Sequence, residues 1–254
     1  MYTAFFRLHF VMATPLVLYL LFFAENPAST PPSHHLPIND SLRIEILLDQ
    51  LPLASPKEQS AILKSLRKFE FTDYSSSDKD QFTQFISNKK NVSSELVLLC
   101  GFLKMDQTLN TLAIKYKNDK HLLQQVNIAL VRAGDPQKAE TLRKNIEKLT
   151  VNDDLVYELL PLLVYTKNAK IYDWLLTNIL SNEKNCHPAD AEGAGNINCA
   201  YRIIEAITPN IIDFPLAVDR WGDLKVDSYP KALAMVQDWI KVNQNSYNIN
   251  IQTY

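Results

Sequence analysis

One short segment concentrates the residue types that bind metals or form covalent cross-links. These residues lie in or directly after the loop at positions 182–198 and are Cys186, His187, Asp190, Glu192 and Cys199. Two cysteines 13 positions apart can close a disulfide, which in the chain-entropy account stabilises a fold by about 3 kcal/mol. Disulfides persist in oxidising compartments. We therefore predict a disulfide between Cys186 and Cys199.

The same loop is a weaker candidate for a metal site. A structural zinc site normally uses two closely spaced ligand pairs, and the adjacent Cys186 and His187 do not form one. Asp190, Glu192 and Asn196 alternate like calcium ligands, but the glycine and the distal glutamate of an EF-hand are misplaced. We expect no metal here, and a polar loop tied by the disulfide instead.

No spacing of residues predicts a catalytic site. His34 and His35 lie in a proline-rich stretch and are expected to face solvent, and His121 is expected at the exposed start of a helix. A Ser-His-Asp or Cys-His arrangement is recognised by convergence in space, which spacing along the chain does not reveal. We therefore predict no catalytic residue, no cofactor-binding residue and no cofactor.

The elements that position these residues repeat one apolar template. Apolar residues recur at i, i+3, i+4 and i+7, which is one face of an α-helix, and two such helices recur at steps of 30 and 33 residues. The first helices carry the template at Leu96, Leu99, Cys100 and Leu103, at Val126, Ala129, Leu130 and Ala133, and at Leu159, Leu162, Leu163 and Thr166. The second helices carry it at Leu109, Leu112, Ala113 and Tyr116, at Ala139, Leu142, Arg143 and Ile146, and at Tyr172, Leu175, Leu176 and Ile179. This period predicts an all-α fold, an α-solenoid whose units stack to bury their faces.

Two template positions hold residues that need an explanation. Cys100 takes the place of Leu130 and Leu163, so we expect a buried, unreactive thiol. Arg143 stands at an apolar position, and we expect it to extend its head to solvent or to pair with an acid where two repeats meet.

The turn of the second unit has a clear local signature. Gly134 can adopt the left-handed conformation that ends a helix, Asp135 can cap the next helix, and Pro136 suits its first turn. At the corresponding place in the third unit, the stretch 167–169 keeps only the capping residue Asn168.

The stretch Ala129–Leu142 (ALVRAGDPQKAETL) resembles a HEAT-type repeat, in which an aspartate lies at the turn and small apolar residues begin the second helix. The Trp, Leu-Gly and Tyr pattern of tetratricopeptide repeats is missing. The resemblance covers about 93–182, or 41–244 if divergent units are included. It implies a right-handed α-solenoid of antiparallel helix pairs and a binding scaffold, and it implies no catalytic residue.

Tryptophans are the candidate binding residues. Trp174 follows the core position Tyr172 by two residues, so it points away from the apolar stripe. Trp221 lies in an irregular segment at 211–229. Because an exposed tryptophan is a common anchor in protein interfaces, we name Trp174 and Trp221 as a candidate binding surface. For Trp174 we nevertheless favour burial against the irregular C-terminal segment over the role of an exposed anchor.

Composition divides the chain into four parts. Residues 1–24 read as a signal peptide or membrane anchor, 25–39 as a flexible linker, 40–244 as the helical repeat domain and 245–254 as a tail that either frays or docks. Within the domain we expect helices from Asp40 or Ser41, over 200–208 and over 230–243. The polar segment 72–80 is expected to be a loop ending in a cap at Ser77 or Asp78.

The N-terminus has the pattern of an export segment. Arg7 and His9 precede 15 uncharged residues, Phe10–Ala24, a length typical of a secretory signal. Phe22 does not favour cleavage after Ala24, so an uncleaved anchor stays open, and a buried N-terminal helix is the alternative to export. We predict an exported protein that is periplasmic, secreted or anchored by this segment.

Charge and glycine content exclude several classes. The 26 basic and 28 acidic residues nearly balance and form no basic stripe, which argues against nucleic-acid binding. Only 5 glycines occur, too few for a Rossmann or P-loop protein. We therefore predict a non-catalytic scaffold of the cell envelope or exterior that binds a protein or peptide and touches membrane only through its N-terminal segment. The alternative is an envelope enzyme or accessory subunit with a pocket near Trp221.

Overall fold

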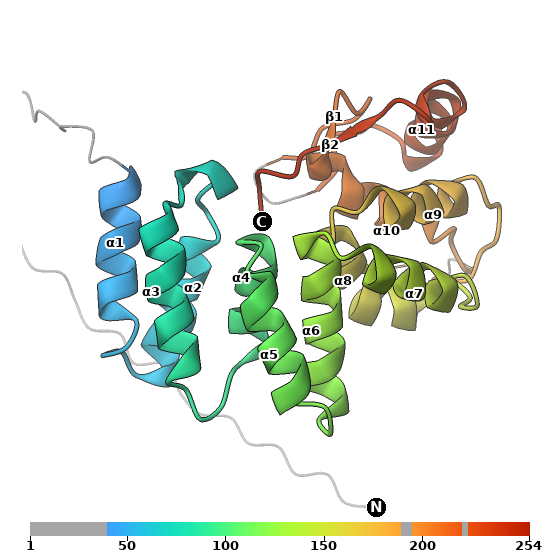
Figure 1. Cartoon of the computed structure of the whole chain (residues 1–254). Coiled ribbons are helices and arrows are strands. Elements are labelled where there is room, and N and C mark those ends of the chain that lie inside the picture. Colours follow the sequence, from blue (N-terminus) through green and yellow to red (C-terminus); the bar gives the residue numbers. More distant parts are fainter. Residues whose placement is uncertain (1–39, 189–194, 220–222) are drawn as a thin grey trace, which may run out of the picture. The chain divides into compact units, whose positions relative to one another are not determined.

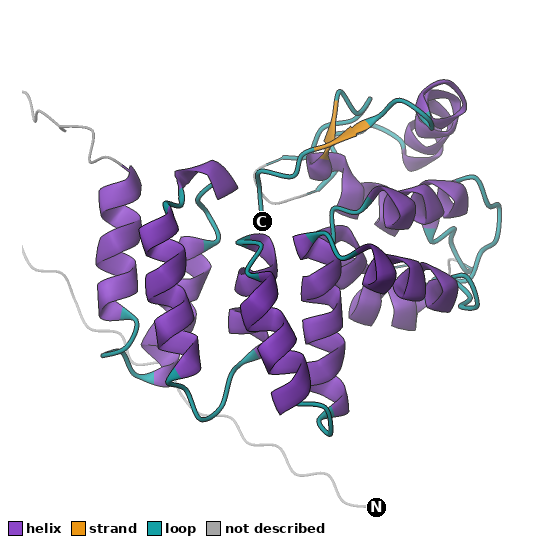
Figure 2. Cartoon of the chain, in the orientation of Figure 1, coloured by secondary structure: helices purple, strands orange, loops and turns teal. Residues whose placement is uncertain are grey.

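A computed structural model describes residues 40–188, 195–219 and 223–254. These residues are predominantly helical, with eleven α-helices and one two-stranded antiparallel sheet (Figures 1 and 2). The proposed export segment, the linker, His34, His35, Asp190, Glu192 and Trp221 lie outside the described residues. Within the described ranges, no helix has the length and apolar character needed to cross a membrane.

The helices follow the chain in order. They are α1 (Asp40–Gln50), α2 (Pro56–Leu66), α3 (Ser76–Ser87), α4 (Ser94–Phe102), α5 (Asp106–Lys115), α6 (Lys120–Ala133), α7 (Pro136–Ile146), α8 (Leu160–Tyr165), α9 (Ala169–Ile179), α10 (Ala200–Ile207) and α11 (Tyr229–Asn243). Shorter elements are the 3₁₀ helices η1 (Phe71–Asp73) and η3 (Thr208–Asn210), the π-helix η2 (Leu155–Leu159), and the strands β1 (Ile211–Ile212) and β2 (Asn248–Ile249).

Each helix packs mainly against helices that are near it in the chain. In Figure 1, α4–α6 (green) follow α1–α3 (blue to teal), and α6 in turn contacts α7 and α8. Buried apolar side chains form two clusters, one over α1–α6 and one over α7–α11. The contact between α4 and α6 is close at Gly101, where a Cβ atom would lie 2.7 Å from the Cα of Ala129. Only glycine permits this approach.

The turns repeat along with the apolar template. Lys104, Gly134 and Lys167 have φ angles of 56°, 113° and 46°, and they lie at the predicted steps of 30 and 33 residues. Asp135 caps α7 by accepting from the N–H groups of Gln137 and Lys138 at 2.8 and 2.9 Å, as predicted for this turn. The left-handed lysines were not predicted, because lysine has no preference for that conformation.

The third unit departs from the predicted continuous template. Leu159 and Leu162 are only half-buried, whereas Leu160 and Leu163 are fully buried. The cause is η2, in which the Leu160 N–H donates to the carbonyl of Leu155, five residues back. Pro161 has no N–H to give the helical ladder at this point, and the wider turn shifts the face that meets the core.

The cap predicted at Ser77 or Asp78 was wrong, by two or three residues. Helix α3 begins at Ser76, and Ser75 is its cap. The Ser75 hydroxyl accepts from the Asp78 N–H at 3.1 Å, while the Asp78 carboxylate accepts from the Ser75 N–H at 2.8 Å. This reciprocal capping box accounts for the earlier start.

The C-terminal residues dock rather than fray. Strand β2 pairs with β1, with Ile211 opposite Ile249, and the chain then runs extended to α4 (Figure 1). The buried Arg132 on α6 donates from Nη2 to the carbonyls of Ile251 and Thr253 at 3.0 and 2.7 Å. The tail is therefore fixed through its backbone.

A second buried cation lies beside Arg132. Lys167 is only 6 % exposed. Its Nζ donates a hydrogen bond to Asn210 Oδ1 and lies 3.5 Å from Thr253 Oγ1. Burial, and secondarily the charge of Arg132, lower the pKa of Lys167 to about 7. The fold therefore holds an amine that loses its proton near neutral pH.

Replacing a buried template residue by a charge tests the register. Leu130 is 2 % exposed, so we expect Leu130→Asp to lower the free energy of unfolding by about 4 kcal/mol or more, or to prevent folding. Ile114 is 75 % exposed, and Ile114→Asp should change it by no more than about 0.5 kcal/mol. Urea unfolding measures both, and similar losses for the two variants would show that the register is wrong.

The buried amine makes stability depend on pH. Because the folded-state pKa of Lys167 lies below its unfolded value of about 10.4, the unfolded chain binds more protons above pH 7. The free energy of unfolding should therefore rise from pH 6 to 8.5, by on the order of 1 to 2 kcal/mol from this group. Lys167→Met should remove this part of the slope in urea unfolding at several pH values. Parallel curves for wild type and variant would contradict the assignment.

Candidate functional site

An open groove lies between α6, α7 and the start of the third repeat unit. A pocket of about 630 Å³ opens between α6 and the segment 149–162. A second pocket of about 440 Å³ continues along α6 and α7 and shares Gln124, Leu149 and Leu159 with the first. We call the two together the α6–α7 groove.

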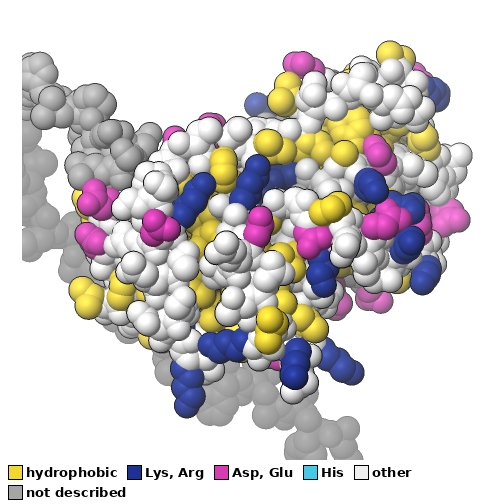
Figure 3. Space-filling model, in the orientation of Figure 1, with side chains coloured by type: hydrophobic (Ala, Val, Ile, Leu, Met, Phe, Trp, Pro, Cys, Tyr) yellow, Lys and Arg dark blue, Asp and Glu magenta, His cyan; other side chains and the backbone are white. Residues whose placement is uncertain are grey.

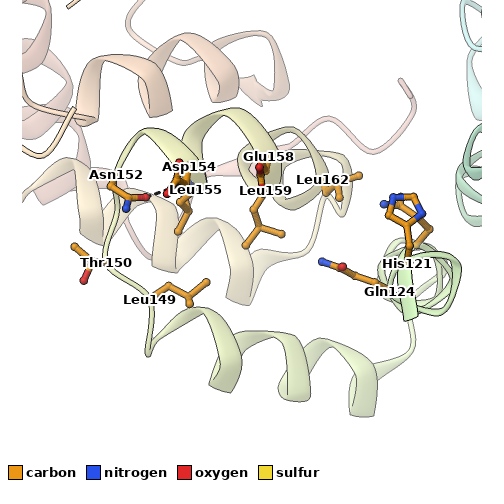
Figure 4. A pocket seen from close by; sticks show the side chains of 11 residues that line it. His121, Gln124, Leu149, Thr150, Asn152, Asp154, Leu155, Glu158, Leu159 and Leu162 are labelled. Atoms are coloured by element: carbon orange, nitrogen blue, oxygen red, sulfur yellow. Dashed lines mark hydrogen bonds between the residues drawn. The ribbon is translucent and has the colours of Figure 1, made fainter. Parts of the chain in front are cut away.

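The floor of the α6–α7 groove is apolar. Leu149 and Leu159 lie near one another, and Gln124 projects from α6 toward them from the opposite side (Figure 4). Leu149 is 47 % exposed although it is a large apolar residue. Leu123 and Leu142 continue the floor into the second pocket, and both are half-buried. Leucines that line an open groove make this surface a candidate interaction site.

The two pockets of the groove carry opposite charges. Asp154 and Glu158 line the first pocket, one helical turn apart, and neither has an ion-pair partner among the residues described here. Lys120 and Lys138 line the second pocket, at the starts of α6 and α7. The first pocket therefore carries acidic side chains and the second carries lysines, and both pockets share Leu149 and Leu159.

Two amides of α6 leave acceptors unused along the groove. Gln125 lines the first pocket and Asn127 the second. In the described part of the chain, the buried Gln125 Oε1 and Asn127 Oδ1 atoms have no donor. A buried oxygen without a hydrogen-bond donor lowers the stability of the fold. A small movement of either amide that brings its oxygen to an N–H group of a ligand would therefore be favourable.

The groove shows no arrangement for catalysis. His121 is its one histidine, and no hydrogen bond joins it to a nucleophile within the described residues. Over the same residues, no group of three or more His, Cys, Asp or Glu side chains could hold a metal ion. The surface can bind by apolar contact, charge and hydrogen bonds.

The structure brings the two loop cysteines together. The sulfur atoms of Cys186 and Cys199 lie 2.13 Å apart, at disulfide distance. Beside them, His187 donates its backbone N–H to Asp153 Oδ2 at 3.1 Å, and its ring Nδ1 contacts the same oxygen. The hydrogen bond from the His187 side chain lowers the pKa of Asp153. His187 thus anchors the loop to the segment before η2.

Trp174 lies on α9, outside the α6–α7 groove. It is half-buried against the C-terminal apolar cluster and lines a pocket of about 580 Å³ between α7 and α9. Glu140 in this pocket accepts from Arg143 at 3.0 Å and from Lys170 at 3.1 Å, which lowers its pKa to about 2. Acidic and basic side chains lie together over α7 and α9 on the face in Figure 3.

The expectations for the two tryptophans and for Arg143 differ in outcome. Arg143 pairs with acids, as one of its two alternatives predicted, and Glu140 extends the pairing from α7 to Lys170 on α9. Trp174 is half-buried and stays a candidate. Trp221 lies outside the described residues, so its role stays a prediction.

Sequence reasoning missed the α6–α7 groove. The template assigned Leu159 and Leu162 to the core of the third unit and Leu142 to that of the second, and Leu123 and Leu149 fall outside it. The available signal was Pro161 within a helical pattern, which marks a break in the hydrogen-bond ladder.

Comparison of the chain with protein-family models, with curated proteins and with solved structures found no match.

The cysteine assignment is directly measurable. Mass spectrometry of non-reduced, protease-digested protein should find Cys186 linked to Cys199. Burial raises the pKa of the Cys100 thiol, so Cys100 should react with iodoacetamide only after unfolding. Free, alkylated thiols at both loop positions would contradict the disulfide.

Proposed function

We propose that this chain is a non-catalytic scaffold that binds an amphipathic segment of a partner protein in the α6–α7 groove. The observation that carries the proposal is the leucine floor shared by a pocket with two acidic residues and a pocket with two lysines. Catalytic sites need converging titratable groups, whereas this surface separates its charges and places apolar side chains between them.

The charges of the groove specify the chemistry of the occupant. Asp154 and Glu158 favour a lysine or arginine at one end of the bound segment, and Lys120 and Lys138 favour an acidic residue at the other. The leucines favour large apolar side chains in the middle. N–H groups of the segment can satisfy the unused amide oxygens of α6.

We further propose that the helical region is a HEAT-like α-solenoid, right-handed and made of antiparallel pairs. Packing between helices that are near in the chain supports this, as does the left-handed residue at each of the three turns. Such arrays present extended surfaces to peptides and proteins.

An exported setting is part of the proposal. A cysteine pair at disulfide distance fits an oxidising compartment, and the apolar stretch Phe10–Ala24 has the pattern of an export signal. The domain boundaries at 24, 39 and 244 belong to the same proposal.

Peptide display tests the groove directly. Random 15-residue peptides selected on the wild-type protein should be enriched in a basic–apolar–acidic pattern, and synthetic versions should bind in fluorescence anisotropy. Leu149→Glu places a charge on the floor and should weaken binding about tenfold or more. Glu158→Lys should reduce the affinity of peptides with a basic end.

A matched control separates the groove from general apolar adhesion. Ile114 is also exposed but lies outside the groove, so Ile114→Glu should bind the selected peptides like wild type. Peptides that bind folded Leu149→Glu and wild type equally, or a selection without enrichment, would refute the proposed function.

A further inference from the structure

The cleft that holds residues 250–254 has the construction of a peptide-binding site. Arg132 donates to the carbonyls of Ile251 and Thr253, and the Phe71 N–H donates to the carbonyl of Gln252 at 2.8 Å. These bonds go to the main chain, so any extended segment could receive them. We call this surface, lined by Phe71, Arg132 and Lys167, the tail cleft.

The tail cleft also has a seat for an aromatic ring. The Tyr254 ring lies 5.7 Å from that of Phe102 and 5.2 Å from that of Tyr165, measured between centroids. The Arg67 guanidinium carbon lies 4.7 Å from the Tyr254 centroid. Aromatic contacts and a cation over the ring together select an aromatic side chain at this position.

The charge of the tail cleft is not matched by the segment inside it. Arg132 and Lys167 are 8 % and 6 % exposed. Their hydrogen bonds go to carbonyls and to the neutral side chains of Asn210 and Thr253. Among the described residues, no aspartate or glutamate lies within ion-pair distance of either cation. Buried cations of this kind favour a ligand that brings a negative charge.

The position of the missing charge is defined by Thr253. Its Oγ1 lies 3.5 Å from Lys167 Nζ, so the side chain at this position of a bound segment faces the lysine. A carboxylate there would give the ammonium a charged acceptor, whereas the threonine hydroxyl is a neutral acceptor at a long distance. The aromatic seat holds the next residue.

We propose that the tail cleft binds an extended acidic peptide with a carboxylate one residue before an aromatic side chain. The chain's own residues 250–254 then occupy the cleft as a weaker ligand, which such a peptide displaces. This inference does not depend on the α6–α7 groove, which lies on other residues.

Peptide binding to a chain with a loosened tail tests the preference. The probes are fluorescein-labelled, C-terminally amidated peptides NINIQDY and NINIQNY, which differ only in charge at the Thr253 position. Tyr254→Ala in the full chain should bind the Asp peptide about tenfold or more tightly than the Asn peptide. Adding Lys167→Met should abolish the difference. Equal affinities, or no binding by folded Tyr254→Ala, would overturn the proposal.

A control variant shows whether displacement of the tail matters. Tyr157 is 66 % exposed and does not contact the tail, so Tyr157→Ala should bind the Asp peptide as weakly as wild type. Equal binding by Tyr157→Ala and Tyr254→Ala would mean that the peptide binds elsewhere.

A second measurement needs no loosened tail. In the otherwise wild-type chain, Thr253→Asp should melt at a higher temperature than Thr253→Asn at pH 7, and the difference should vanish with Lys167→Met. In addition, the Phe71 amide should exchange its hydrogen faster than the Leu130 amide in the core, because the tail opens locally. Identical melting temperatures, or exchange of Phe71 only with global unfolding, would each refute the proposal.

Discussion

A guanidinium group buried between α6 and the last residues of the chain links parts of the fold that are far apart in sequence. Arginine keeps its charge in any folded protein. The Arg132 guanidinium donates to two carbonyls of the tail. Its central carbon lies 5.4 and 5.8 Å from the ring centroids of Phe102 and Tyr165. Loss of the tail would leave this charge without its acceptors, which is costly in a buried place. A polar segment therefore stays ordered against the helices.

The close approach of α4 and α6 is the second constraint on this region. Gly101 lets the two backbones meet, and Tyr165 reaches across from α8 to donate to the carbonyl of Leu98. The same tyrosine forms one wall of the seat for Tyr254. Because these contacts share side chains, packing of the core and docking of the tail are coupled.

Apolar spacing was sufficient to predict most helices and the capped turn at Gly134, because both depend on local residues. It failed at Pro161, since a count of helical positions assumes an unbroken hydrogen-bond ladder. It also missed the left-handed Lys104 and Lys167, because lysine has no preference for that conformation. The sequence could not predict where the tail docks. Main-chain carbonyls accept the hydrogen bonds from Arg132 that hold the tail, and every residue has such a carbonyl.

The candidate site was harder to predict than the fold. The pairing of Cys186 with Cys199 follows from residue type and spacing, and the structure places the two sulfurs at disulfide distance. The α6–α7 groove does not follow from spacing, because its leucines look like core residues until the π-helix turns them outward. Sequence reasoning chose tryptophans as anchors, whereas the open apolar surface is made of leucine.

The π-helix has a consequence for the balance between stability and function. By turning Leu159 and Leu162 partly out of the core, it gives up apolar burial that a regular helix would retain. Proteins often sacrifice stability where a surface must stay open for a partner. Under the proposed function, a variant with a regular helix here would bury Leu159 and Leu162 more completely and remove part of the groove floor, so selection for heat resistance alone would act against the proposed binding.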